Sequence, residues 1–462
     1  MSIVGAIIVP HPPVILPTVG KGREKQAEAT LRAYRAAAAQ VRAWAPEALV
    51  IASPHIPLYA DYFHICPGRQ AQGDMAAFGA PQTRLTVACD VPLRREICRL
   101  AGEANLPAGT LGAREEKLDH GSFLPLYFLQ EAGVDCPAVR MGLSGLSPLD
   151  HYRLGQCVAQ AAQALNRRVV FVASGDLSHK LKADGPYGFA PQGPQFDRQV
   201  TQAMAQGDFL ALLTMDPLLC RQAAECGLRS FQIMAGALDG QGVASQLLSH
   251  QDDFGVGYAV ALFAPQGPDP SRRFAQRYQA AEAARLAARR AGEDPWVRLA
   301  RLALETWVNT GKALAQLPPD LPPELTNQAA GAFVSLHIRD QLRGCIGTTA
   351  PTRPCLAWEI AGNAVSAGVR DPRFSPVTRA ELDQLEYSVD VLTPPEPIDS
   401  SAQLDAKRYG VIVSRGGRRG LLLPDLEGVD TVEQQIAIAR KKAGIAPHEP
   451  CALERFEVVR HH

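Results

Sequence analysis

Residues 169–179 read VVFVASGDLSH, and this stretch decides the fold of the first part of the chain. Its opening residues, 169–173, form an uninterrupted apolar run rich in valine, which is typical of a strand buried on both faces of a parallel sheet. A glycine ends the run and His179 follows shortly after it. We therefore predict an α/β fold in which functional side chains follow the carboxyl ends of buried strands.

Other histidines occur in the same setting. One apolar run ends at His11 in the sequence VPHPP, and a second ends close to His55 in ASPH. Since the carboxyl ends of parallel strands meet at one edge of a sheet, we expect these side chains to gather there, with His120 of LDHGSF as a further member. Neutral imidazole is the commonest metal ligand and titrates near neutral pH, so the pattern predicts a metal and a proton-transfer group.

Length and composition predict a globular protein of two or three domains. The chain has 462 residues, of which 46% are hydrophobic and 20% are charged. Lysine plus arginine and aspartate plus glutamate both number 47, so no global field favours nucleic acid or a membrane surface. No apolar stretch approaches the roughly 20 residues of a membrane-spanning helix.

The amino-terminal residues and the cysteines predict a cytoplasmic location. The start, MSIVGAIIVPHPP, lacks the basic residues and the cleavage site of a secretion signal. The ten cysteines are scattered and form no CxxC pair, so we expect reduced thiols.

The alternation of strand-like and helix-like segments predicts the domain organisation. Residues 1–264 alternate between the two and predict a layered α/β domain, whereas residues 265–294 predict a linker helix with a solvated, arginine-rich face. Residues 295–462 pair strand-like segments in hairpins beside helices, which predicts a smaller α+β domain. Helices are predicted at 23–44, 93–104, 149–165, 196–214, 297–314, 358–367 and 432–443, and a last strand at 452–459.

His11 and His55 are the natural pair of metal ligands, and a third ligand must come from elsewhere. The segment AAECG at 223–227 is the best source, because an acid followed by a thiol in an apolar segment needs an explanation. Glu225 would complete a set of two histidines and a carboxylate, which suits iron(II) or zinc. Cys226 would instead supply a thiolate, which favours a softer ion such as copper.

Five motifs resemble those of the class III extradiol ring-cleavage dioxygenases, the LigB-like proteins, and within them the Memo-like branch. The resemblance covers the first 264 residues, and DHGSFLPL and SGDLSH are its more specific parts. The matching segments are PHPP at 10–13, SPH at 53–55, LDHGSFLPLYFL at 118–129, SGDLSHK at 174–180 and ECGLRS at 225–230.

The resemblance implies a role for each residue of the site. It implies iron(II) on His11, His55 and Glu225, a general acid/base at His179, and His120 in the substrate pocket. Memo-like proteins carry a Cys-Gly pair where the dioxygenases carry their glutamate. This chain contains both, as Glu225 and Cys226, so both candidates stay open.

The motif LRGCIG at 342–347 is the most unusual feature of the second domain. Arg343 beside the thiol of Cys345 would lower the pKa of that thiol and make it reactive. The alternative is a buried structural cysteine in a turn that the glycines shape.

The motif resembles the hallmark of the AMMECR family, and the resemblance runs from about residue 295 to 460. RDPRFSPV at 370–377, SVDVLTPPEPI at 388–398 and GLLLP at 420–424 also match. The resemblance implies a functional cluster, whose members are Arg343, Cys345, Asp371 and Arg373.

The two resemblances together imply the AmmeMemoRadiSam system, with a radical-SAM protein as partner. The chain has no CxxxCxxC motif, so it is not that partner itself. Two hypotheses follow: a metalloenzyme with dioxygenase-like or related redox chemistry on a small or aromatic substrate, or a non-catalytic scaffold that binds a ligand or peptide.

Overall fold

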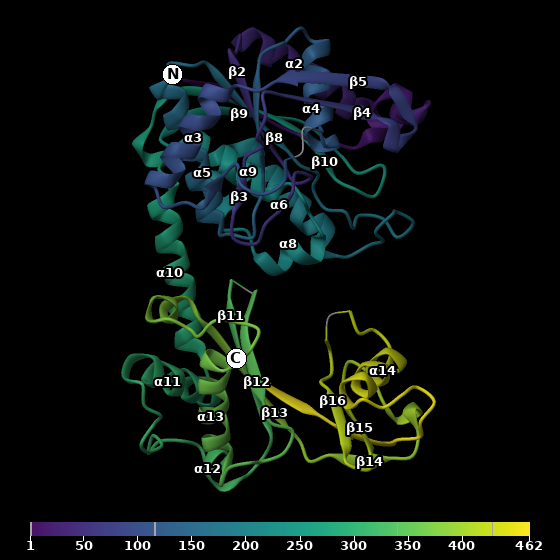
Figure 1. Cartoon of the computed structure of the whole chain (residues 1–462), viewed down its shortest axis with the longest axis vertical. Coiled ribbons are helices and arrows are strands. Elements are labelled where there is room, and N and C mark those ends of the chain that lie inside the picture. Colours follow the sequence, from purple (N-terminus) through teal and green to yellow (C-terminus); the bar gives the residue numbers. More distant parts are fainter. Residues whose placement is uncertain (1, 115–116, 340, 427) are drawn as a thin grey trace. The chain divides into compact units, whose positions relative to one another are not determined.

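A computed structural model of the chain shows two compact units, the first ending at Glu282 and the second beginning at Ala283 (Figure 1). The boundary falls within helix α10 (Phe274–Gly292). Each unit has hydrophobic cores of its own. The structure describes residues 2–114, 117–339, 341–426 and 428–462.

The first unit is built on a six-stranded sheet with the order β7-β2-β8-β1-β10-β9. β7, β2, β8 and β1 are parallel to one another, and β10 and β9 close the sheet with antiparallel pairing. Every residue of β2 and β8 is buried, which explains their continuous apolar sequences. The strands are β1 (Ile3–Val9), β2 (Ala48–Ser53), β7 (Ala138–Gly142), β8 (Val169–Ser174), β9 (Gln241–Gln251) and β10 (Tyr258–Pro268).

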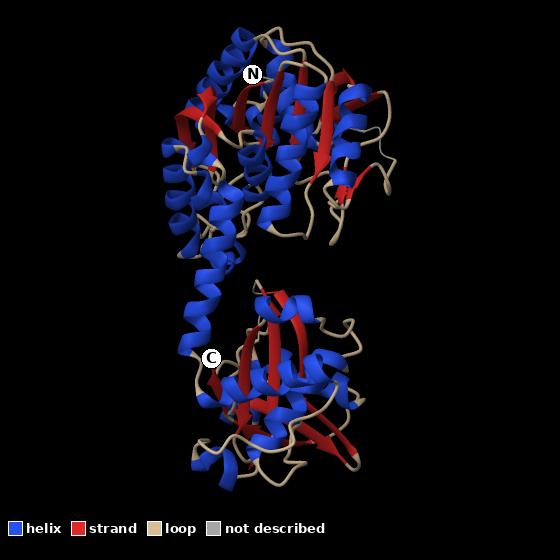
Figure 2. Ribbon diagram, turned by 90° about the vertical axis from the view of Figure 1, so that its left-hand side faces the viewer, coloured by secondary structure: helices blue, strands red, loops and turns tan. Residues whose placement is uncertain are grey.

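Helices cover both faces of this sheet, as Figure 2 shows. One face packs against α3 (Val91–Glu103), α5 (Pro148–Ala164), α6 (Gln192–Gln206) and α9 (Leu228–Ala237). The other face packs against α2 (Glu28–Trp44) and α4 (His120–Glu131). The predicted layered α/β class is confirmed. The remaining elements are α1 (Pro17–Gly20), α7 (Phe209–Leu213), α8 (Pro217–Ala223), and the strand pairs β3 (Phe63–His64) with β6 (Ala108–Gly109) and β4 (Gln70–Met75) with β5 (Ala80–Ala88).

The single helix predicted over residues 196–214 is wrong. The chain leaves the helix at Gly207, where φ is +63°, and restarts at Asp208, whose carboxylate accepts a hydrogen bond from the Ala211 N–H. A glycine in the left-handed conformation ends α6, and an aspartate N-cap begins α7. Both signals are local, and they outweigh the continuous apolar periodicity.

The second unit contains two four-stranded antiparallel sheets, with the orders β12-β11-β13-β18 and β14-β17-β15-β16. α11 and α13 pack on the first sheet, and α14 packs on β15 and β16, so the predicted α+β arrangement is confirmed. The elements are α11 (Pro295–Thr310), α12 (Pro323–Asn327), β11 (Ala332–Ile338), β12 (Gln341–Gly347), α13 (Leu356–Val369), β13 (Glu386–Leu392), β14 (Glu396–Ile398), β15 (Gly410–Arg415), β16 (Arg418–Leu422), α14 (Val432–Ala443), β17 (Ala452–Phe456) and β18 (Val458–His461).

The strand predicted over residues 452–459 is two strands. β17 and β18 belong to different sheets and are separated at Glu457, whose N–H donates to Thr393 Oγ1 at 2.8 Å. The change of partner at one residue links the two sheets.

The arginines of α10 were predicted to form a solvated face, but several of them bind other residues. Arg285 and Arg289 both form ion pairs with the buried carboxylate of Glu386, at 2.8 and 2.9 Å. Arg290 donates to the carbonyl oxygen of Leu382 at 2.9 Å. The carboxyl-terminal half of α10 is therefore anchored on the second unit.

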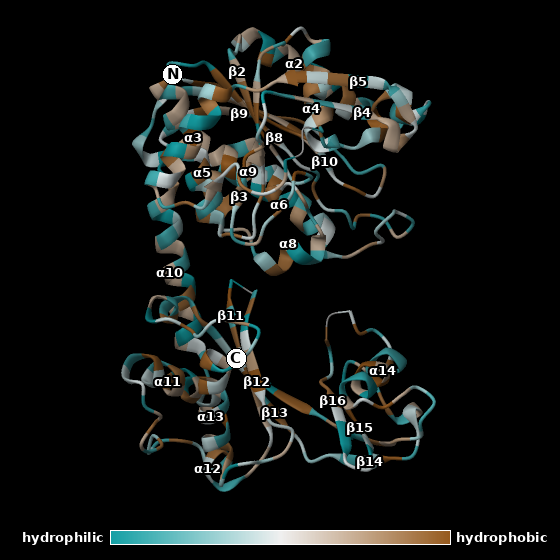
Figure 3. Ribbon diagram, in the orientation of Figure 1, coloured by the Kyte–Doolittle hydropathy of each residue, from teal (hydrophilic) through white to brown (hydrophobic). Residues whose placement is uncertain are grey.

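Hydrophobic residues, brown in Figure 3, concentrate on the strands, where the cores lie. Among the helices that the structure describes, none has the length and apolar character needed to cross a membrane.

Candidate metal centre

The residues around His11 hold its imidazole in one tautomer. His11 follows β1, and its backbone N–H donates to Asp176 Oδ1 at 2.9 Å. Its Nδ1 lies 3.0 Å from Ser174 Oγ, and that hydroxyl donates to the carbonyl oxygen of Gly121 at 2.6 Å. Because the hydroxyl hydrogen is already used, Ser174 Oγ accepts a hydrogen bond from Nδ1–H. The lone pair is therefore on His11 Nε2, as a metal ligand requires.

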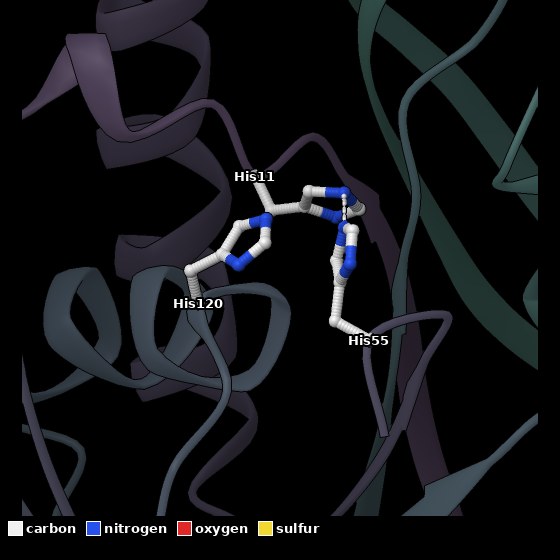
Figure 4. A group of neighbouring side chains, drawn as sticks. All are labelled: His11, His55 and His120. Carbon is white, nitrogen blue, oxygen red and sulfur yellow. Dashed lines mark hydrogen bonds between the residues drawn. The ribbon is translucent and has the colours of Figure 1, made fainter. Parts of the chain in front are cut away.

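Three imidazoles converge at the carboxyl ends of β1 and β2 and the start of α4 (Figure 4). His11 Nε2 lies 3.0 Å from His55 Nε2, and the ring centroids of His55 and His120 are 3.8 Å apart. One potential ligand atom from each of the three lies within 4.8 Å of the others. His11 is buried whereas His55 is exposed, so the group opens toward solvent on the His55 side.

The imidazoles of this group are held in the neutral form. Burial and the neighbouring His55 lower the pKa of His11 to about 3. Burial, with His55 and His11 nearby, also lowers the pKa of His120 to about 3. Burial lowers the pKa of His55. Near pH 7 these rings therefore keep a nitrogen lone pair available to a cation.

Hydrogen bonds to Asp119 connect the end of β2 with the start of α4. As the N-cap of α4 it accepts hydrogen bonds from the N–H and the hydroxyl of Ser122, at 2.9 and 2.6 Å. It also accepts one from Ser53 Oγ at 2.6 Å, which fixes His55 relative to His120. A Cβ at Gly121 would collide with Ser53 Oγ and lie 3.1 Å from His55 Cδ2, so only glycine allows this approach. The DHGSF segment is thus the structural frame of the group.

Cys226 lies beside the group and Glu225 points elsewhere. The Cys226 Sγ is 3.8 Å from His11 Nε2 and accepts a hydrogen bond from the Asp176 N–H at 3.3 Å. Glu225 Oε2 instead accepts a hydrogen bond from the Leu228 N–H at 2.7 Å, at the start of α9. Burial, with Asp176 close by, raises the pKa of the Cys226 thiol well above its usual value.

His179 has an imidazole nitrogen without a hydrogen-bond partner. Its backbone N–H donates to the carbonyl oxygen of Ala223 at 3.1 Å, and its ring stacks on Tyr187 with the centroids 5.0 Å apart. Its Nε2 is buried and has no hydrogen-bond partner among the described residues. Burial lowers the pKa of His179, so the ring is available to accept a proton.

Asp176 is a residue of the site that the sequence did not predict. Its Oδ2 lies 3.8 Å from His11 Nε2, and burial raises the pKa of its carboxyl to about 6. The Asp176 carboxylate therefore lies close to the His11 imidazole, and Asp119 is a second acidic neighbour of that ring. The available signal was its place in SGDLSH, between the strand and His179.

Of the cluster predicted in the second unit, Cys345, Asp371 and Arg373 are in contact, whereas Arg343 binds Glu381 and Ser375. The Arg343 guanidinium donates to Glu381 Oε1 at 2.7 Å and to the Ser375 carbonyl at 3.0 Å. Cys345 Sγ accepts a hydrogen bond from Ser335 Oγ at 3.2 Å, and burial raises the pKa of the thiol. Of the two alternatives for Cys345, these contacts favour the structural cysteine over the activated thiol, because Glu381 and Ser375 bind the Arg343 guanidinium.

Asp371 and Arg373 hold the backbone of the LRGCIG strand. Asp371 Oδ2 accepts a hydrogen bond from the Cys345 backbone N–H at 2.9 Å and forms an ion pair with Arg373 at 2.7 Å. Arg373 also donates a hydrogen bond to the Cys345 carbonyl oxygen at 3.2 Å. A Cβ at Gly344 would collide with the carbonyl oxygen of Ala367 in α13. The motif therefore allows close packing of β12 on α13 and fixes its free edge.

Comparisons with known families match both units. Residues 5–261 match the family described as the catalytic LigB subunit of aromatic ring-opening dioxygenase, and residues 297–461 match the AMMECR1 family. Protein CA_C1420 of Clostridium acetobutylicum is 37% identical over 469 aligned residues, which cover 100% of this chain and 99% of that protein. A protein of Thermotoga maritima is 52% identical over 174 residues, which cover 37% of this chain and 98% of that protein.

Two solved structures are similar to parts of the chain. Uncharacterized protein PH0010 from Pyrococcus horikoshii shares 37% identity, covering 36% of this chain and 88% of that chain, with a TM-score of 0.34. Uncharacterized protein JW3007 from Escherichia coli K12 shares 16% identity, covering 56% of this chain and 99% of that chain, with a TM-score of 0.40.

Proposed function

We propose that this chain, which belongs to the LigB family through residues 5–261 and carries an AMMECR1 domain at residues 297–461, is a metalloenzyme. The observation that carries this proposal is the convergence of His11, His55 and His120, with ligand atoms within 4.8 Å of one another. Neutral imidazoles, a fixed tautomer at His11 and one open side are what a catalytic metal needs.

We propose iron(II) as the metal, because imidazole suits iron and the matched family is described as an aromatic ring-opening dioxygenase subunit. Zinc and copper also accept imidazole and thiolate ligands, so they are the alternatives to measure. An iron(II) ion bound here would supply the activation of O₂ beside a small aromatic diol.

The protein's own groups supply the proton chemistry. His179 Nε2, which has no hydrogen-bond partner among the described residues, would accept a proton from a substrate hydroxyl and later return it. Asp176 keeps the His11 backbone in place through the His11 N–H. Tyr187, stacked on the His179 ring, restricts the orientation of that ring.

This proposal is tested on the full chain, stripped of metal and titrated with iron(II) without air. We expect equimolar iron binding, followed by O₂ uptake with at least one member of a catechol panel. Equal, negligible binding of iron, zinc and copper would remove the metalloenzyme proposal. If the iron-loaded protein reacts with neither O₂ nor any catechol of the panel, the metal centre is supported and the ring-opening activity is contradicted.

The second candidate function is a non-catalytic scaffold for a radical-SAM protein. The half-buried Cys345 thiol favours it for the AMMECR1 unit, because its contact is the Ser335 hydroxyl and its pKa is raised, so that the thiol is not activated for chemistry. Stable co-purification of the full chain with a radical-SAM protein, together with no metal binding by the chain, would support this candidate over the enzyme.

Variants of the neighbouring donors test which of them complete the metal centre. We expect His120→Gln and Cys226→Ser each to weaken iron(II) binding by at least about tenfold, since even outer-shell losses cost 10–100-fold. Glu225→Gln is the matched control and should change the affinity less than about twofold, because Glu225 binds the Leu228 N–H. Loss of iron from Glu225→Gln with full retention in the other two variants would contradict this assignment.

A further inference from the structure

We propose that β9 of the first unit pairs with β9 of a second copy of this chain, in an antiparallel arrangement centred on Ser245. The six-stranded sheets of the two copies would then form one continuous sheet across a twofold axis, with the same surface used by both copies. This inference goes beyond the proposed function and uses none of the residues of the metal centre.

β9 is the outer strand of the six-stranded sheet, and its outward side is open. The sheet order ends with β9, whose pairing partner is β10. Among the residues that the structure describes, no group outside β10 forms a hydrogen bond with the backbone of residues 242–250. Every residue of the strand is at least partly exposed. The outward N–H and C=O groups are therefore free to bond to the backbone of another strand.

β9 lacks most of the features that prevent edge strands from pairing with other chains. Natural edge strands are often short, or they contain charged residues or proline. β9 has 11 residues, and its sequence, QGVASQLLSHQ, contains neither proline nor any aspartate, glutamate, lysine or arginine. Bulges at Leu248 of β9 and Gln266 of β10 flank residues 243–247, which stay in unbroken register with β10. This central segment, residues 243–247, is therefore a regular and uncharged template for another strand.

The helices next to β9 add little net charge to this edge. α6 packs on β9, and the Ser245 hydroxyl donates to the carbonyl oxygen of Ala205 in α6 at 2.9 Å. Arg198 is the one exposed charged side chain of α6, whose other exposed polar residues are glutamines at positions 195, 199, 202 and 206. At the start of α2, the exposed Glu28 and Arg32 form an ion pair at 3.8 Å, so their charges balance. Since 20% of the chain is charged, this edge is depleted of charge, as the centre of a protein interface typically is.

The central segment is complementary to itself. Centring the antiparallel pair on Ser245 places Val243 opposite Leu247 of the partner subunit, and Ala244 opposite Gln246 of the partner subunit. Val243 and Leu247 pack against the core on the α6 side, so their pairing extends that core across the axis. Ala244 and Gln246 are exposed and uncharged. Because no charge lies opposite a like charge at any of these positions, a second copy of the chain is the occupant that this edge fits.

Multi-angle light scattering after gel filtration measures the mass of the full chain over a range of concentrations. We expect a mass of twice 49.7 kDa, approached as the concentration rises. The double variant Ala244→Lys/Gln246→Lys places like charges opposite one another and should have the mass of one chain, because opposed like charges destabilise a strand pair. The matched control is Gln70→Lys/Gln72→Lys, which adds the same charges at exposed positions of β4 and should remain a dimer.

A charge swap tests the register of the strand pair. In Ala244→Lys/Gln246→Glu each introduced lysine faces an introduced glutamate of the second copy, so this variant should form the dimer again. A wild type with the mass of one chain at every concentration would overturn the proposal, and so would a dimeric variant with both lysines. If the charge-swapped variant has the mass of one chain, the pair is not centred on Ser245 and the proposal is wrong.

A measurement on the wild type covers the case in which a variant fails to fold. Backbone amides that are hydrogen-bonded across the axis are protected from exchange with solvent. Hydrogen exchange in residues 243–247 should therefore be slower at concentrations where the dimer prevails than at those where single chains prevail, whereas exchange in β4 should be the same at both. Equal exchange of residues 243–247 at both concentrations would place the contact elsewhere and contradict the proposal.

Discussion

Replacing His11 and His55 together by alanine is expected to abolish iron(II) binding by the full chain. The two Nε2 atoms lie 3.0 Å apart, and the lone pair of His11 is fixed by the hydrogen bond from Nδ1 to Ser174. Loss of an outer-shell partner alone costs about 10–100-fold in metal affinity, so loss of both ligands should exceed a hundredfold. Anaerobic titration with iron(II), read by metal analysis after gel filtration, measures the effect.

The control is His448→Ala, which removes an exposed histidine of the second unit and should bind iron like the wild type. The double variant should keep its helix content, because the frame around Asp119 does not use either ring. If the folded double variant and the wild type hold iron with equal affinity, the metal lies elsewhere and the centre is wrongly assigned.

The edge of the sheet where the site lies could be predicted from the sequence, because it depends on strand periodicity. The apolar runs before His11, His55 and His179 required buried strands, and β1, β8 and β2 are adjacent and parallel. Parallel neighbours end at one edge whatever the details of packing.

Side-chain direction could not be predicted in the same way. Glu225 and Cys226 are neighbours in the sequence, yet one binds the Leu228 N–H at the start of α9 and the other lies against Asp176 and His11. Arg343 is next to Gly344 in the hallmark motif, but its partner is Glu381, far along the chain. For Cys226 and Arg343 the deciding contact is distant in sequence, whereas Glu225 is held by a helix start that its own sequence does not reveal.

Replacing Gly236 by alanine is expected to destabilise the first unit strongly. Gly236 lies in α9 where this helix crosses α5, and a Cβ there would collide with the carbonyl oxygen of Tyr152. A Cβ at Gly155, on the facing side of α5, would collide with the carbonyl oxygen of Ile233. Backbone atoms cannot rotate away as side chains do, so the helices would have to separate, at a cost of about 3 kcal/mol.

Helix propensity acts in the opposite direction and is too small to reverse the sign. Alanine is preferred over glycine inside a helix by roughly 1 kcal/mol, so the net loss should lower the melting temperature of the first unit by about 4–8 °C. Gly102→Ala in α3 isolates the propensity, because a Cβ there meets nothing within 4 Å. That control should be neutral or slightly stabilising in calorimetry. If Gly236→Ala has the same melting temperature as Gly102→Ala, the helices have room to separate and the prediction is wrong.

The crossing of α5 and α9 also connects the stability of the unit to the site. α9 begins directly after Cys226 and Gly227, and a Cβ at Gly175, at the end of β8, would collide with the Gly227 Cα. A shift of α9 away from α5 would therefore move Cys226 relative to His11. We expect Gly236→Ala to weaken iron(II) binding at temperatures where the protein is still folded, whereas Gly102→Ala should not. Unchanged iron affinity in folded Gly236→Ala would mean that the start of α9 is held by β8 independently of the helix crossing.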